Sequence, residues 1–388
     1  MPLISQSLAD LPAPAPDALA HSRRITAHIR AAIQAAGGAI PFSRYMDLAL
    51  YAPGLGYYSA GARKFGAAGD FVTAPELSSL FSRCLARQCA EVFAEIGQAS
   101  ILELGAGSGV MAADMLLELQ ALDRLPADYL ILEVSAELRE RQRQTLASKA
   151  TGLASRVRWL DALPDAFDGV ILGNEVLDAL TVERFLKRPG GFDEYCVRAE
   201  DEGFAWLTRP AGEQLAATLA AFETTLPQPL ASGYVSELNL GVMPLISSLA
   251  QMLTRGALLL LDYGYPRAAY YHPERSMGTL MCHYRQRAHD DPFLYPGLQD
   301  ITTHVDFTAV AEAGTSSGLD LAGYTTQAHL LMALGVAGLA GTDMRAAQQV
   351  KLLTLPEEMG ERFKAIGFTR GVETVLRGFE LLDLSRQL

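Results

Sequence analysis

The sequence has few cysteines and none of the spacings of cysteine and histidine that bind metal ions. Only four cysteines occur among 388 residues, and no two of them form a Cys-x-x-Cys motif. These facts exclude a disulfide-rich scaffold and a zinc ribbon, and they predict free thiols in a reducing compartment. Three histidines in the second half of the chain also lack metal-ligand spacing, so we predict no metal site. The cysteines are Cys84, Cys89, Cys196 and Cys282, and the histidines are His283, His289 and His304.

Long hydrophobic runs and a surplus of positive charge are also missing. The least charged stretch, residues 321–342, is interrupted by four glycines and contains His329, so it does not suit a membrane span. The chain does not open with a basic region followed by an apolar run, and no signal peptide is expected. The formal charge of −12 argues against a nucleic-acid-binding surface. These absences predict a cytoplasmic protein that binds neither membranes nor nucleic acids, and they leave a homodimer open.

The most informative stretch that is present is ILELGAGSGV, residues 101–110. Its apolar start predicts a short buried strand, and Gly105, Gly107 and Gly109 predict a turn in which the backbone approaches a ligand without a Cβ in the way. Residues 111–120 continue with the apolar spacing of a helix. Strand, glycine turn and helix together are typical of a nucleotide-type site, with helix N-terminal amides facing the ligand.

The spacing of these glycines separates two classes of ligand. A dinucleotide fingerprint has glycine at the first, third and sixth positions, whereas the sixth position here is Val110. Glu103, two residues before the first glycine, suits a ligand with an ammonium group, such as the methionine part of S-adenosylmethionine. A glycine turn on an unrelated α/β strand fits the same residues, so the spacing alone leaves both interpretations open.

Polar residues follow three further segments that are predicted to be strands. In an open parallel sheet the carboxyl ends of the strands bind the ligand, and an acid after the second strand commonly binds ribose hydroxyls. Glu133 holds that second position, about 28 residues past the first glycine. The full series is Glu133 after residues 129–132, Asp161 and Ala162 after residues 157–160, and Asn174 and Glu175 after residues 169–172.

The remaining parts of the chain are predicted from composition and periodicity. Three more strands are expected at residues 257–261, 319–325 and 362–368, which gives seven in all. In the stretch before the glycine turn, Thr73 and Glu76 fit a capping box. Asp70 and Phe71 lie in a glycine loop just before that cap and are candidate ligand contacts.

The expected divisions are a lead-in at 1–20, a helical and loop segment at 21–95, the first half of the cofactor domain at 96–180, an inserted ribbon with helices at 181–250, and the second half of the sheet at 251–388, with a lid at 266–303.

Several motifs resemble those of class I S-adenosylmethionine-dependent methyltransferases, and more specifically the MidA-type family. They include ELGAGSG, ILEVS, GDFVTAPELS, GNEVLDALTVERF and LLLLDYGYP, and the resemblance runs from about residue 30 to residue 371. The glycine turn of the family is often Gly-Pro-Gly-Arg-Gly, whereas Ala106 and Ser108 stand between the glycines here. That family includes the mitochondrial complex I assembly factor, which is a protein arginine methyltransferase.

The resemblance implies a fold, a cofactor and a set of site residues. The fold is α/β, a class I methyltransferase Rossmann-like seven-stranded sheet with N-terminal helices, an inserted antiparallel ribbon and a long substrate lid. The cofactor is S-adenosyl-L-methionine, and the substrate is a protein whose arginine is methylated. The expected cofactor contacts are Asp70, Phe71, Thr73, Glu103, Gly105, Ala106, Gly107, Gly109, Glu133, Val134, Asp161, Ala162, Asn174 and Glu175.

Three carboxylates are predicted to be catalytic: Glu175, Asp178 and Glu183. A carboxylate can fix the planar guanidinium of arginine and hold charge density on one nitrogen. Helix capping and solvated surface charge are the structural alternatives for Asp178 and Glu183. Rival functions are a nicotinamide dehydrogenase, an S-adenosylmethionine-binding assembly factor that acts by protein contact, and a methyltransferase for small molecules.

Overall fold

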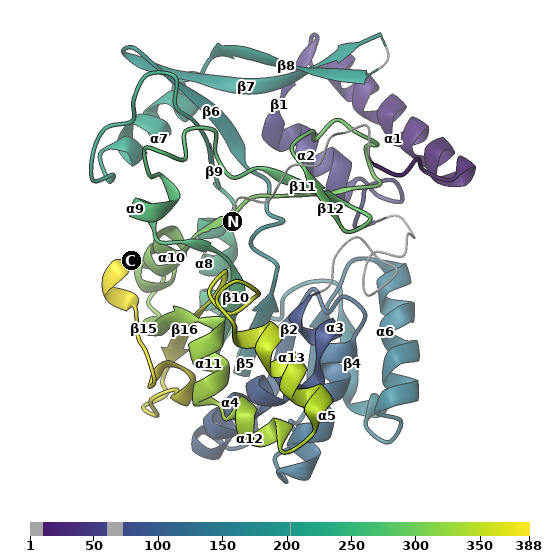
Figure 1. The fold of residues 1–388 in the computed structure, drawn as a ribbon, viewed down its shortest axis with the longest axis vertical. Helices are drawn as coiled ribbons and strands as arrows, with labels where there is room; N and C mark the ends of the chain where they lie inside the picture. Colours follow the sequence, from purple (N-terminus) through teal and green to yellow (C-terminus); the bar gives the residue numbers. More distant parts are fainter. Residues whose placement is uncertain (1–10, 60–72, 202) are drawn as a thin grey trace.

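A computed structural model describes residues 11–59, 73–201 and 203–388 of the chain (Figure 1). The predicted ligand contacts Asp70 and Phe71 lie outside these residues. Within the described ranges no helix is both long enough and apolar enough to cross a membrane. All four cysteines are buried free thiols.

The central sheet has the seven strands that the sequence predicts, and the predicted fold class is confirmed. Its strand order is β15-β16-β10-β5-β2-β3-β4, and a short β14 also pairs with β10. The neighbours from β10 to β4 run parallel, whereas β16 is antiparallel to both β10 and β15. The strands are β2 (Ser100–Leu104), β3 (Tyr129–Leu132), β4 (Val157–Leu160), β5 (Phe167–Asn174), β10 (Leu253–Tyr265), β14 (Val305–Asp306), β15 (Asp320–Thr326) and β16 (Phe363–Arg370).

Two glycines allow the middle strands to approach one another closely. Gly169 on β5 has φ +145°, and a Cβ there would overlap the carbonyl oxygen of Ser100 on β2. Gly256 on β10 has φ +142°, and a Cβ there would overlap the carbonyl oxygen of Gly169. Only glycine fits where another backbone comes this close, so these positions fix the alignment of β2, β5 and β10.

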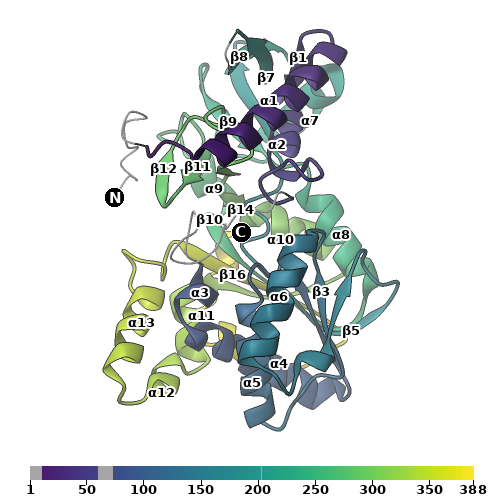
Figure 2. The ribbon, with the colours of Figure 1, turned by 90° about the vertical axis from the view of Figure 1, so that its right-hand side faces the viewer.

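Helices cover both faces of this sheet (Figure 2). One core cluster joins the sheet to α4, α5 and α11 to α13, and the other joins it to α8 and α10. Sheets with parallel strands need such cover because both of their faces are apolar. The helices are α3 (Ala74–Leu77), α4 (Ser79–Ile96), α5 (Val110–Ala121), α6 (Ala136–Lys149), α8 (Val242–Met252), α10 (Phe307–Ser316), α11 (Gln327–Ala333), α12 (Val336–Ala340) and α13 (Met344–Thr354), with 3₁₀ turns at Ala154–Arg156, Arg377–Phe379 and Ser385–Gln387.

A second, antiparallel sheet lies beyond the carboxyl ends of the central strands, at the top of Figure 1. The sequence predicts only a ribbon here, but five strands are present because β1 also pairs with β7 and β9 pairs with β6. A separate core cluster packs α1 and α2 against this sheet. The elements are α1 (Pro16–Ala35), β1 (Ala39–Pro41), α2 (Phe42–Tyr51), β6 (Glu183–Arg188), β7 (Gly191–Glu200), β8 (Gly203–Pro210), α7 (Glu213–Glu223) and β9 (Val235–Leu238).

The segment 266–303 is ordered into short elements, whereas its sequence predicts a loop with little periodicity. It contains α9 (Arg267–Tyr270) and a three-stranded sheet of β11 (Met281–Tyr284), β12 (Arg287–His289) and β13 (Asp300–Thr302). Cys282 and Ile301 of this sheet are fully buried in the cluster that contains α1 and α2. The segment is therefore packed onto the second sheet and is not a free loop.

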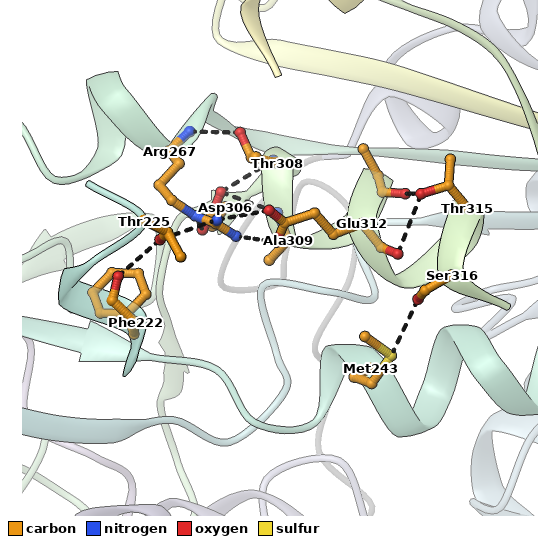
Figure 3. Close-up of polar contacts among 11 residues, drawn as sticks. Phe222, Thr225, Met243, Arg267, Asp306, Thr308, Ala309, Glu312, Thr315 and Ser316 are labelled. Carbon is orange, nitrogen blue, oxygen red and sulfur yellow. Dashed lines mark hydrogen bonds and ion pairs between the residues drawn. The ribbon is translucent and has the colours of Figure 1, made fainter. Parts of the chain in front are cut away.

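Arg267 anchors the start of this segment (Figure 3). Its guanidinium forms ion pairs with Asp306 (3.1 Å) and with Glu312 on α10 (2.8 Å). It also lies over the ring of Phe222, with 5.9 Å to the ring centroid. The side chain is almost fully buried, so the ion pairs are needed to offset its desolvation.

Candidate active site

A first cavity of about 280 Å³ opens at the carboxyl ends of β2, β3 and β5. The glycine turn from Gly105 to Ser108 forms part of its lining, together with Glu103, Glu133 and Asn174. These groups come from three neighbouring strand ends, as the sequence predicts. The structure therefore brings most of the predicted cofactor contacts together in one place.

The glycine turn uses the left-handed backbone region at each of its glycines. The φ angles are +63° at Gly105, +52° at Gly107 and +81° at Gly109, which is the N-cap of α5. Residues with a Cβ rarely adopt such angles, so the turn depends on glycine at these positions. The turn leads directly into α5, whose first amides lie at its end.

The predicted capping box of Thr73 and Glu76 does not form. The side chain of Thr73 makes no capping hydrogen bond, and the Glu76 carboxylate instead accepts a hydrogen bond from the hydroxyl of Ser108. The chain turns between α3 and α4, where the hydroxyl oxygen of Ser78 accepts a hydrogen bond from the amide of Leu80 (3.2 Å). Glu76 thereby ties the segment before α4 to the glycine turn, and both Thr73 and Glu76 line the first cavity.

Glu103 is a buried acid in β2 at the back of the first cavity. It is 2% exposed and accepts a hydrogen bond from the hydroxyl of Tyr129 (2.7 Å). Burial, with a smaller contribution from the neighbouring Glu133, raises the pKa of Glu103 to about 7. A buried carboxylate with a raised pKa is stabilised in its charged form by a cation, so this position suits the ammonium of a ligand.

Glu133 follows β3 and is held by two donors. Its carboxylate accepts hydrogen bonds from the amide of Ser135 (2.9 Å) and from Nε2 of Gln142 (3.2 Å). Nε2 of Gln142 also donates to the carbonyl oxygen of Gly107 (3.1 Å). The acid and the glycine turn are therefore positioned by one side chain, and the exposed Val134 lines the cavity beside them.

Three predicted cofactor contacts among the described residues are not part of this cavity's lining: Gly109, which caps α5, and Asp161 and Ala162. Asp161 and Ala162 follow β4, and neither belongs to the cavity lining that the described residues form. The side chain of Asp161 is 91% exposed and forms an ion pair with Arg139 (2.6 Å). Arg139 also donates to the carbonyl oxygens of Glu133 and Leu160, so this pair fixes the loop ends after β3 and β4.

A second cavity of about 680 Å³ adjoins the first. Tyr58 and Glu175 line both cavities, which makes them the boundary between the two. Residues of the segment 266–303 form much of the second cavity, so the predicted lid contributes its wall. Its further polar and aromatic lining includes Asp178, Tyr263, Tyr265, Asp300, His304 and Phe363.

Glu175 stands at this boundary in a strained conformation. Its φ is +53°, which is unusual for a residue other than glycine and is common at functional sites. Its amide donates to the carbonyl oxygen of Leu261 (2.8 Å), and its Oε1 accepts from Nδ2 of Asn174 (3.1 Å). Burial raises the pKa of Glu175 to about 8, with Asp178 and Asp300 adding to the effect.

Asp178 and Asp262 form a buried pair of acids behind Glu175. Oδ2 of Asp262 accepts hydrogen bonds from the amides of Leu177 (2.9 Å) and Asp178 (3.2 Å), which fixes the loop after β5. The Asp178 carboxylate is hydrogen-bonded to the hydroxyl of Tyr263, but its Oδ1 is buried and has no partner among the residues described. Burial raises the pKa of Asp178 to about 6.

Glu183, the third predicted catalytic acid, is not placed with the other two. It begins β6 and accepts a hydrogen bond from the hydroxyl of Ser43 (2.6 Å). It belongs to neither cavity as the described residues outline them. Its position supports a structural role between α2 and β6.

Four residues that line the second cavity are not among the predicted site residues and are revealed only by the fold: Tyr58, Tyr263, Asp300 and His304. Tyr263 and His304 flank the predicted lid, and Asp300 lies within it. The aromatic and acidic content of that segment was a signal for the region, but no spacing in the sequence points to these individual residues.

The residues of the first cavity fit S-adenosylmethionine. Glu133 can accept hydrogen bonds from a pair of hydroxyl groups, and the glycine turn leaves room for close approach of a ligand. Oδ1 of Asn174 is buried and has no hydrogen-bond partner within the described part of the chain. It is therefore available to accept a hydrogen bond from a ligand group such as an ammonium. Apolar side chains of Met111, Leu132 and Leu138 complete the lining.

Comparisons with known proteins support S-adenosylmethionine as the cofactor. Residues 84–325 match the family model described as "Putative S-adenosyl-L-methionine-dependent methyltransferase". A crystal structure of a protein from Burkholderia thailandensis bound to S-adenosyl-homocysteine is 48% identical, with a TM-score of 0.93 over 98% of this chain and 100% of that one. A second crystal structure from the same organism is 46% identical, with a TM-score of 0.90.

Curated relatives carry a more specific name. The mitochondrial protein arginine methyltransferase NDUFAF7 of Danio rerio is 28% identical over 88% of this chain and 86% of its own length. The protein of the same name from Mus musculus is 28% identical over 84% of this chain and 80% of its own length. The predicted cytoplasmic location is wrong on this comparison, because the names of these relatives place them in mitochondria.

Proposed function

This chain belongs to the family of S-adenosyl-L-methionine-dependent methyltransferases, and we propose that it methylates an arginine side chain of a protein substrate. The observation that carries the proposal is the position of Glu175, which lines both the cofactor cavity and the larger cavity beside it. A carboxylate at that boundary faces the place where a nucleophile must meet the methyl group. The curated relatives named above supply the choice of arginine.

The cofactor is S-adenosyl-L-methionine, which when bound supplies an electrophilic methyl group on a sulfonium sulfur. We propose that Glu133 accepts the ribose hydroxyls and that Glu103 and Asn174 hold the charged end of the methionine part. The glycine turn and Val134 form the walls around it. Asp70 and Phe71 remain predicted contacts of the same ligand.

The acids of the second cavity suit a guanidinium. Arginine is always protonated near neutral pH, and its planar fork presents five N–H donors. Glu175 and Asp178 offer carboxylate oxygens at the boundary and in the interior of the cavity, where charge-assisted hydrogen bonds are strong. Most of the rate enhancement in methyl transfer comes from alignment of the nucleophile with the methyl carbon, and these acids fix one nitrogen in place.

One proton must leave when a guanidinium nitrogen is methylated, because the methylated product carries the same single charge as the substrate. Glu175 receives this proton in the proposed mechanism. The charge of a bound guanidinium favours the ionised carboxylate, and the burial that raises its pKa to about 8 in the free protein makes it a stronger base than an ordinary carboxylate. Asp178, which is hydrogen-bonded to the hydroxyl of Tyr263, supplies a second carboxylate that balances the charge of the methylated guanidinium in this proposal.

The segment 266–303 covers the substrate in this proposal. It supplies Arg275, Thr279, His283 and Asp300 to the second cavity, and it is packed against the second sheet. The cavity is far larger than one arginine side chain requires, so it has room for neighbouring residues of a protein. The net charge of −12 also suits a cationic target.

Transfer of labelled methyl groups tests the proposal. The protein and S-adenosylmethionine with a radioactive methyl group are incubated with a lysate of cells that lack the protein, and the labelled proteins are hydrolysed to amino acids. Label in methylarginine is expected. Label confined to small molecules, or to lysine or carboxyl groups of proteins, contradicts the assignment of arginine.

A further inference from the structure

Neutral polar groups form part of the second cavity, beside the acids described above. Thr279 and His304 both line it. The amide of His304 donates a hydrogen bond to Oγ1 of Thr279 (3.1 Å), and the hydroxyl of Tyr270 lies 3.0 Å from the same atom. Thr279 therefore fixes the backbone of His304 at the cavity.

The imidazole of His304 is held between two tyrosine rings. Its ring centroid lies 5.2 Å from that of Tyr263 in an edge-on contact and 5.2 Å from that of Tyr265 in a tilted one. Burial, together with the smaller effects of the nearby Arg275 and Lys364, lowers the pKa of His304 to about 3. The imidazole is therefore neutral at physiological pH, and one of its nitrogens can accept a hydrogen bond.

Two buried polar atoms in this cavity have no partner among the described residues. Nδ1 of His304 and Oδ1 of Asp178 are both buried and make no hydrogen bond to any residue that the structure describes. Buried polar atoms in native proteins are nearly always paired, because an unpaired one costs about 1–3 kcal/mol. The Asp178 oxygen is an acceptor, and Nδ1 of His304 is one in the tautomer that carries its proton on Nε2, so the pair suits a ligand with several N–H donors.

A buried ion pair in the second sheet holds this wall in position. Glu237 on β9 is 1% exposed and pairs with Arg184 on β6 (2.8 Å). Its other oxygen accepts a hydrogen bond from the amide of Thr279 (2.8 Å). Gly278 has φ +79°, and a Cβ there would overlap the Glu237 carboxylate, so the chain passes directly over the acid.

We propose that His304 is a specificity-determining residue that accepts a hydrogen bond from the substrate guanidinium, and that Thr279 and Glu237 are positioning residues for it. The inference rests on the proposed function, because it takes arginine as the substrate side chain. Asp178 and Glu175 attract the cation by their charge. The neutral imidazole favours a guanidinium over other cations because it accepts a hydrogen bond from a second position of the planar group. The compact ammonium of lysine has three donors on one nitrogen and cannot span acceptors on separate walls as a guanidinium can.

Binding of a minimal guanidinium ligand tests this role. The probe is N-acetyl-L-arginine amide, titrated by calorimetry into the protein saturated with S-adenosyl-homocysteine. His304→Phe keeps an aromatic ring between the two tyrosines but removes the acceptor, and it should weaken binding at least tenfold. His304→Asn keeps an acceptor near the position of Nδ1 and should recover part of that loss. The matched control is His28→Phe, at an exposed histidine of α1, and it should bind like the wild type.

The affinity for S-adenosyl-homocysteine should be the same in all these variants, because His304 lies outside the first cavity as described. Equal binding of the arginine amide by the wild type and His304→Phe overturns this inference and leaves the proposed function untouched. Failure of the wild type to bind the arginine amide also overturns it. Absence of methylarginine in the labelled lysate overturns the proposed function itself.

The positioning role is tested by a pair of substitutions at one residue. Thr279→Val removes the hydroxyl that receives the amide of His304, whereas Thr279→Ser keeps it. Thr279→Val should raise KM for the arginine substrate severalfold with kcat nearly unchanged, and Thr279→Ser should restore KM. A fall in kcat with constant KM, or no difference between the two variants, contradicts the proposed positioning.

Discussion

The hydroxyl of Tyr58 donates a hydrogen bond to Oδ1 of Asp300 at 2.8 Å. Tyr58 belongs to the segment that follows α2, and Asp300 begins β13. This contact joins the N-terminal part of the chain to the segment 266–303 at the boundary of the two cavities. The boundary of the two cavities therefore depends on residues that are far apart in the sequence.

Removing this hydroxyl should weaken the contact between these two segments. Tyr58→Phe keeps the ring and should lower the free energy of unfolding by about 1–2 kcal/mol, since a hydrogen bond to a carboxylate is lost. Denaturation in urea measures the change. Tyr195→Phe is the control, because the ring of Tyr195 packs edge-on against Trp206 and its hydroxyl makes no hydrogen bond that the structure describes. A loss as large in the control as in Tyr58→Phe contradicts the account.

The glycine turn should be essential for cofactor binding. Gly107→Val places a β-branched side chain at φ +52°, where it strains the turn that lines the first cavity. The variant should remain folded and lose at least a hundredfold in affinity for S-adenosyl-homocysteine, measured by calorimetry. Gly152→Val, at an exposed glycine with open space around its Cβ, should bind normally. Normal binding by folded Gly107→Val would show that the cofactor does not bind in this cavity.

Substitution of two acids at neighbouring strand ends should affect the cofactor affinity to different extents. Glu133→Ala removes the acceptor proposed for the ribose hydroxyls and should weaken cofactor binding by about 2–4 kcal/mol, since hydrogen bonds to charged groups contribute about 1.5–3 kcal/mol each. Asp161→Ala is the matched control, because Asp161 is exposed and paired with Arg139. It should change the cofactor affinity by only a few tenths of a kcal/mol. A larger loss of cofactor affinity in Asp161→Ala than in Glu133→Ala would contradict the roles given to the two acids.

Stability should fall with rising pH because of Glu175. Its pKa lies near 8 in the folded protein and near 4.5 in the unfolded chain. Between these values the folded protein holds a proton that the unfolded chain has released, so the free energy of unfolding decreases from pH 5 to pH 8. Glu175→Gln removes the part of this dependence that Glu175 contributes, so it should gain stability relative to the wild type as the pH rises across the same range. Glu103 and Asp178, whose pKa values are also raised, keep their own contributions. Urea denaturation at pH 5, 6.5 and 8 measures the difference, with the exposed Glu140→Gln as control. A constant difference across pH argues against a raised pKa.

The central sheet could be predicted from the sequence because its strands are short apolar runs that end in polar residues. β3 and β4 begin and end at the predicted residues, and the predicted Glu133, Asn174 and Glu175 lie at the first cavity. The pattern is strong because both faces of a parallel sheet are buried, which leaves little room for polar side chains within its strands.

The second cavity could not be predicted in the same way. Part of its wall comes from β11 and β13, which have four and three residues. Strands this short do not show the alternation of apolar and polar residues by which a strand is predicted. Its acids are brought together by long-range contacts such as that between Tyr58 and Asp300. The capping box failed for a similar reason, because Glu76 binds Ser108 across the fold and not its own helix start.

Glu175 should matter more for methyl transfer than for cofactor binding. Glu175→Gln keeps the shape of the side chain and removes its charge and its capacity to take up a proton. The rate of transfer should fall by roughly a hundredfold, or about 2.7 kcal/mol of transition-state stabilisation. The affinity for S-adenosyl-homocysteine should change little, because Glu133 and the glycine turn remain. Asp178→Asn, in the interior of the second cavity, should lower the rate as well.

The most direct test of the account is fragmentation mass spectrometry of proteins methylated by the wild type and by Glu175→Gln in parallel. Arginine, lysine and carboxyl methylation give different fragments, so one measurement reports both the methylated atom and the need for the carboxylate. The account predicts methylated arginine with the wild type and about one-hundredth of that product with Glu175→Gln at equal time. Methyl groups on another kind of side chain, or equal yields from the two proteins, would contradict it.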